Sequence, residues 1–90
     1  MIRSVADLTE QDLAEIEARV AAASGGPWQA SIEGRDHTSG DSFIAVAGGP
    51  DMYVSRDAAP ASAADLDFIA AARQDVPRLI DEVRRLRSPG

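Results

Sequence analysis

Arginine is the residue type in this chain best suited to holding a ligand, and Arg73 stands out by its position. At one residue per 100° of helix turn, Leu66, Ile69 and Ala70 share a helix face with it. A charge on an apolar face is costly to bury unless an acid or an anion pairs with it. The guanidinium fork could hold a phosphate with two hydrogen bonds. Alternatively, its stem packs on the core and its head meets helix carbonyls or an acid.

The other candidate contacts are aromatic side chains and one histidine. Trp28 follows the Gly25-Gly26-Pro27 corner and is either a core residue holding a helix on a sheet or a stacking surface for a base. Phe68 carries the same ambiguity, and we expect it in the core. His37 lies in a polar loop, where we expect it to be solvated or a peripheral contact. A metal site at His37 would need two or three further ligand side chains, and the sequence offers only scattered carboxylates. No metal or cofactor is therefore expected.

Catalytic patterns are missing from the sequence. It contains no Gly-x-Ser-x-Gly, P-loop, dinucleotide-binding glycine pattern, HExxH or EF-hand spacing. Paired acids such as Glu15 and Glu17 are two residues apart on an expected helix, so they point away from each other. We therefore expect a protein that is not an enzyme.

Composition limits the class of partner. The 90 residues are expected to form a single domain, 1–90, whose thin core favours self-association into a homo-oligomer. The net charge of −6, with nine basic residues that are all arginine, disfavours long DNA or RNA but permits a small anion. No apolar run is long enough to span a bilayer, no signal-peptide core is present, and cysteine is absent. A cytoplasmic location without membrane contact is expected.

Local patterns predict an α+β fold with an N-terminal helix, a three-stranded antiparallel sheet and two C-terminal helices. Thr9 and Asp12 resemble a capping box, and the Gly25-Gly26-Pro27 run follows the helix. Ser62 is expected to cap the next helix. Whether Pro77 separates two helices or kinks one stays open at this stage. The expected helices are 10–23, 63–74 and 75–86, and the expected strands are 28–33, 42–47 and 52–55.

Three stretches together resemble a family of small phage and prophage proteins called Ead-like, over roughly residues 8–87. They are Leu8-Thr9-Glu10, Ala22-Ala23-Ser24-Gly25-Gly26-Pro27-Trp28, and Asp67-Phe68-Ile69-Ala70-Ala71-Ala72-Arg73-Gln74-Asp75-Val76-Pro77-Arg78-Leu79. That family commonly has a Gly-Pro-Trp corner and a Phe-Ile-Ala-x-Ala-Arg-x-Asp-Val-Pro-x-Leu-Leu helix pair. Here Asp65-Leu66-Asp67 stands where the family often has asparagine.

The pattern is also similar to that of phage anti-defence sponges. This resemblance implies an oligomer, in the cytoplasm of an infected bacterium, that sequesters a cyclic nucleotide or cyclic ADP-ribose signal in pockets between subunits. It implies Arg73 as the phosphate ligand and Trp28 as a pocket wall; the candidate ligand-binding residues are Arg73, Trp28, Arg35, His37, Arg56 and Phe68. The alternative is a protein-interaction module that inhibits a host protein through the 79–86 helix face. An exposed apolar stripe there would favour that alternative.

Overall fold

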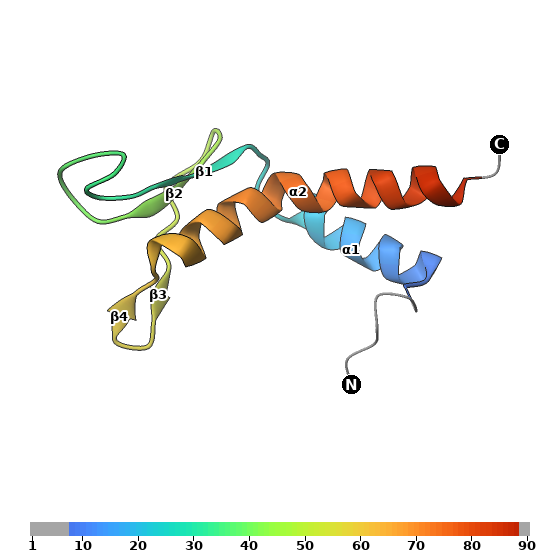
Figure 1. Cartoon of the computed structure of the whole chain (residues 1–90), viewed down its shortest axis with the longest axis horizontal. Helices are drawn as coiled ribbons and strands as arrows, with labels where there is room; N and C mark the ends of the chain where they lie inside the picture. The colour runs from blue at the N-terminus through green and yellow to red at the C-terminus, as the bar shows by residue number, and fades with distance from the viewer. Residues whose placement is uncertain (1–7, 89–90) are drawn as a thin grey trace.

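A computed structural model describes residues 8–88 and confirms an α+β chain with a helix at each end. Figure 1 shows an elongated molecule in which α2 runs past a small sheet at one end and pairs with α1 at the other. The radius of gyration is 16.1 Å, against about 12 Å for a compact domain of this length. The elements are α1 (Glu10–Ala22), β1 (Trp28–Ser31), β2 (Phe43–Val46), β3 (Ser55–Arg56), β4 (Ala59–Pro60) and α2 (Ala63–Arg87).

Both helices begin where their capping residues predict. The Thr9 hydroxyl accepts a hydrogen bond from the backbone N–H of Asp12 at 3.0 Å, and the Asp12 carboxylate accepts one from the Thr9 N–H at 2.9 Å. The Ser62 hydroxyl accepts from the backbone N–H of Asp65 at 3.1 Å. These bonds satisfy N–H groups that a helix start leaves without partners, so the two start positions are confirmed.

The predicted three-stranded sheet is wrong in detail. β1 and β2 pair antiparallel, with Trp28 opposite Val46, but the backbone of the expected third strand pairs with β2 only at Met52, which exchanges two 2.8 Å hydrogen bonds with Ile44. The chain then leaves β2 and forms a separate hairpin, β3–β4, which begins at Ser55, the last residue of the expected third strand. Asp57 begins its two-residue turn with a φ of 42°, a conformation that aspartate tolerates better than most residues.

Two apolar contacts hold the chain together. Leu66 and Ala70 on the N-terminal half of α2 pack with a core that includes Ile44, the most buried residue of β2. At the other end, Leu13 of α1 and Ile80 of α2 are buried where the two helices pack. In Figure 1, α1 runs toward the sheet and α2 runs away from it, so this helix pair is antiparallel.

Residues 63–87 form one continuous helix, which corrects the prediction of two C-terminal helices. Pro77 lies inside α2 and cannot donate to the Arg73 carbonyl, a loss that costs roughly 3 kcal/mol in a helix interior. The two packing contacts on either side of Pro77 offset this cost. Figure 1 shows that the axis of α2 changes direction near its middle, as expected of a proline-kinked helix.

Candidate functional site

Arg73 and Gln74 hold the corner between α1 and β1. The Nε atom of Arg73 donates to the Ser24 carbonyl at 2.9 Å. The Gln74 side chain accepts from the Trp28 N–H at 2.8 Å and donates to the Trp28 carbonyl at 3.2 Å. The Gln74 amide thus makes the two backbone hydrogen bonds that a neighbouring strand would otherwise make with the edge of β1. The contact that the structure shows for Arg73 is internal, and its role as a phosphate ligand stays a prediction.

Trp28 is half-buried and packs against the core, as the structural interpretation of this residue predicted. Its indole Nε1 donates to the Gly25 carbonyl at 3.2 Å, which closes the corner from the other side. Gly26 lies beneath the α2 side chains, and a methyl group added there would meet the Gln74 amide at 3.4 Å. The corner is therefore a close-packed junction of the chain.

Arg35 is engaged by two carboxylates. Its guanidinium binds both oxygens of Asp67 at 2.9 and 3.0 Å, and it also binds Asp36 at 2.9 Å. The Arg35 hydrogen bonds lower the pKa of the Asp67 carboxyl and of the Asp36 carboxyl, and the same bonds raise the pKa of Arg35. These contacts tie the 34–41 loop to α2, so an incoming anion would compete with two acids for Arg35.

His37 is a structural residue of its loop. Its Nδ1 lies 3.0 Å from the Ser31 hydroxyl and its Nε2 lies 3.1 Å from the Asp41 carbonyl. The Nε2–H tautomer satisfies both contacts, because a carbonyl can only accept and a hydroxyl can donate. The ring also lies 5.6 Å from the ring of Phe43, measured between centroids.

The six candidate ligand-binding residues do not converge on one place. Trp28 and Arg35 line a shallow depression of about 350 Å³, together with Asp36, Asp67 and Gln74. Arg56 lies on the β3–β4 hairpin, 3.9 Å from the Asp65 carboxylate. Phe68 is 75% exposed, which corrects the expectation that it lies in the core. The reason is its angle on the helix. Leu66 and Ala70 face the sheet, and Phe68, which is two positions from each of them, points about 160° away.

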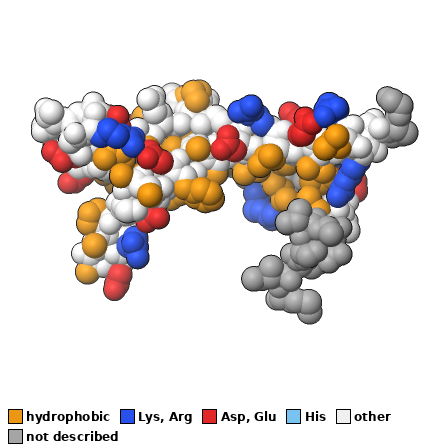
Figure 2. Space-filling model, in the orientation of Figure 1, with side chains coloured by type: hydrophobic (Ala, Val, Ile, Leu, Met, Phe, Trp, Pro, Cys, Tyr) orange, Lys and Arg blue, Asp and Glu red, His pale blue; other side chains and the backbone are white. Residues whose placement is uncertain are grey.

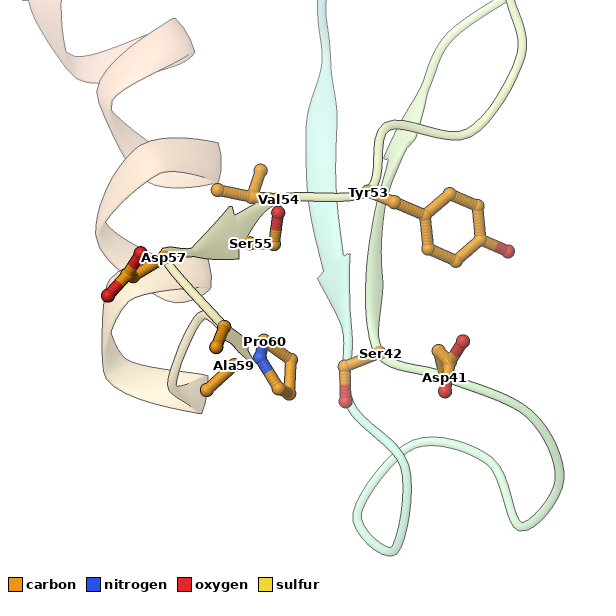
Figure 3. Close-up of a pocket in the computed structure, with 9 residues that line it drawn as sticks. Asp41, Ser42, Tyr53, Val54, Ser55, Asp57, Ala59 and Pro60 are labelled. Carbon is orange, nitrogen blue, oxygen red and sulfur yellow. The ribbon is translucent and has the colours of Figure 1, made fainter.

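A second depression, of about 450 Å³, lies between the β3–β4 hairpin and the segment that leads into β2. Figure 3 shows Asp57 and Pro60 on the hairpin side and Asp41 and Ser42 on the other. Its lining contains carboxylates and hydroxyls but no arginine or histidine. It is therefore a poor site for an anion.

An apolar row runs along a different face of α2, and the fold buries it only in part. We name Ala72, Val76, Leu79, Val83 and Leu86 the α2 stripe. These residues alternate by four and three positions, which keeps them on one side of a helix. Leu79 is 63% exposed and Leu86 is 69% exposed, while the other three are half-buried.

The α2 stripe belongs to a larger apolar surface. Figure 2 shows hydrophobic side chains along the concave side of the molecule below α2 and over the α1–α2 pair. Phe68 lies beside the stripe one turn before it begins, and Ile69 continues its spacing but packs against the core. The 79–86 part of this face was expected from the sequence, but the predicted division of the helix at Pro77 hid its continuation to Val76 and Ala72. Gln74 was missed because its partner, Trp28, is 46 residues away.

Between residues 8 and 88, no helix is long and apolar enough to cross a membrane. Within that same range, no three histidine, aspartate or glutamate side chains are grouped so that they could hold a metal ion. No protein-family model, curated protein or solved structure matches this chain.

Proposed function

We infer that this protein is a non-catalytic protein-interaction module that pairs the α2 stripe with an amphipathic helix. One observation carries this proposal: Leu79 and Leu86 are mostly exposed on the same helix face. Single exposed apolar residues are ordinary on protein surfaces, but a row at helical spacing is typical of a contact surface.

The internal packing of α2 supports the same conclusion. Its buried residues, Leu66, Ala70 and Ile80, occupy the side that faces the sheet and α1. The corner contacts of Arg73 and Gln74 also leave the stripe untouched. Apolar side chains that the fold does not bury would be replaceable by polar ones unless another chain covers them.

Site-specific photo-crosslinking in the cells that naturally carry the protein tests this function. A photoreactive amino acid replaces Leu79 in one variant and Arg85 in a control, because Arg85 is exposed on another side of α2. We expect a discrete crosslinked protein species from position 79 and none from position 85. Equal or absent crosslinking at the two positions would refute the proposal.

A second function, sequestration of a small nucleotide signal, has one observation in its favour. Trp28 and Arg35 line the same depression, and together they offer a stacking face and a cation. Thermal shifts against cyclic dinucleotides, cyclic trinucleotides and cyclic ADP-ribose isomers test it. A ligand at 100 times its dissociation constant stabilises the native state by about 2.7 kcal/mol, which shifts the melting temperature by several degrees. Recovery of the unchanged ligand after heating would show sequestration, and a flat panel would exclude this function.

A further inference from the structure

We propose that the helix that covers the α2 stripe is α2 of a second copy, lying parallel and in register. This inference rests on the proposed function and names the partner of the same surface. The residue types of the stripe are the first argument. In heptad terms, Val76 and Val83 are at a positions and Ala72, Leu79 and Leu86 are at d positions. Branched residues at a with leucine at d favour parallel two-stranded pairing.

The charges beside the stripe are the second argument, because they choose the direction of pairing. On one side, Asp75 and Glu82 are at g positions; on the other, Arg73 and Arg87 are the e positions that flank the buried Ile80. In a parallel pair, each g position of one helix faces the following e position of its partner. Glu82 of each copy would therefore face Arg87 of the other copy, which gives two ion pairs. In an antiparallel pair, g faces g and e faces e, which would place acids against acids and arginines against arginines.

Arg87 is available for that contact, whereas Arg84 is not. In the described part of the chain, Arg84 binds the carboxylates of Glu10 and Glu17, but Arg87 has no ion pair. Glu82 accepts from Arg85 on its own helix and keeps 52% of its side chain exposed. The Arg85 hydrogen bond lowers the pKa of Glu82, so the carboxylate is charged at neutral pH.

The internal packing leaves room for a second helix. The side chains that α2 turns toward the sheet and α1 are at e, b and f positions, among them Leu66, Ala70, Gln74 and Ile80. The centre of the stripe is about 80° around the helix from Ile80, about 120° from Leu66, and about 160° from Ala70 and Gln74. From Ala72 to Leu86 the stripe is about 21 Å long, at 1.5 Å per residue. A parallel pair would place both sheets at the same end of the dimer, with α1 of each copy flanking the central helices.

Cysteine substitution gives a direct test, because the natural chain has no cysteine. Three single variants of the full chain are oxidised at equal concentration: Leu79→Cys, Leu86→Cys and, as control on another side of α2, Asp81→Cys. We expect Leu79→Cys and Leu86→Cys each to form a disulfide-linked dimer, because d positions of parallel helices meet their own equivalents. Asp81→Cys is expected to form no disulfide-linked dimer. Failure of Leu86→Cys to crosslink would overturn the parallel register.

Charge reversal tests the ion pair. Glu82→Arg or Arg87→Glu alone should raise the dimer dissociation constant roughly tenfold, measured by sedimentation, since each turns two attractions into repulsions. The double variant should restore it, which a loss of folding would not. If the wild-type chain is monomeric at high concentration while position 79 crosslinks to another protein in cells, the second-copy inference fails and the proposed function stands. If the wild-type chain does not self-associate and position 79 crosslinks to no protein in cells, both the inference and the proposed function fail.

Discussion

Replacing Gln74 by alanine should loosen the corner and lower stability by a predictable amount. The substitution removes three hydrogen bonds, to the Trp28 N–H, the Trp28 carbonyl and the Ala70 carbonyl, in a partly buried position. A buried polar group left without a partner costs about 1–3 kcal/mol, and some rehydration at the strand edge is expected, so we expect a loss of about 2 kcal/mol. For a domain of this size that corresponds to a fall in melting temperature of about 8–16 °C.

The assay is thermal unfolding at a fixed protomer concentration, followed by circular dichroism and by the fluorescence of Trp28, the single tryptophan. Gln29→Ala is the matched control, because Gln29 is a neighbouring glutamine with an exposed side chain. Gln74→Glu gives a second comparison: its carboxylate can accept from the Trp28 N–H but repels the Trp28 carbonyl. The melting temperature of Gln74→Glu should therefore approach that of the wild type at acidic pH, because the protonated carboxyl group can donate to the Trp28 carbonyl.

A melting temperature for Gln74→Ala within about 2 °C of the wild type would refute this reasoning, because that shift corresponds to less than 0.5 kcal/mol. The corner would then be held by Arg73 and by packing of Trp28 alone. A loss that Gln29→Ala reproduces would show that the strand, and not the amide contact, is the sensitive element.

Three further outcomes are expected. Leu13→Ala should lower the free energy of unfolding by roughly 2–5 kcal/mol in chemical denaturation, because this leucine is only 1% exposed. Arg73→Ala should lower it by about 1 kcal/mol through loss of the Ser24 contact and leave crosslinking at position 79 unchanged. The folded-state pKa of Asp67 lies below its ordinary value of 3.8 because Arg35 binds the carboxylate. Its stabilising effect is thus present above that value and lost as pH falls, so the stability gap between wild type and Asp67→Asn should close on acidification to about pH 2, and a constant gap would contradict it.

Local signals predicted local structure well. The Thr9 capping box, the Ser62 cap and the alternation around Trp28 each depend on residues a few positions apart, so the two helix starts and the first strand were predictable. The third strand failed because its pairing depends on where the chain goes after Met52, which no local pattern encodes. The exposure of Phe68 was likewise undecided until the side of α2 that faces the sheet was known.

The candidate site was less predictable than the fold, since its key contacts are long-range. Arg73 was singled out correctly as an arginine on the packed face of α2, yet its partner is a backbone carbonyl 49 residues away. Arg35 was expected to be a loop contact and binds Asp67, 32 residues away. A charged residue on an apolar face therefore indicates that some other group binds it, but only the folded structure identifies that group.

The corner contacts also give a physical reason why two of the stretches that resemble the Ead-like pattern, 22–28 and 67–79, occur together. Ser24 and Trp28 belong to one stretch, Arg73 and Gln74 to the other, and they bind each other directly. Pro77 has no N–H to donate to the carbonyl of the same Arg73, and α2 changes direction near its middle (Figure 1). The bend lets the first half of α2 cover the sheet while its second half packs on α1. Packing on these two supports uses only one side of the helix, so Leu79 and Leu86 of the α2 stripe on the adjacent side stay exposed.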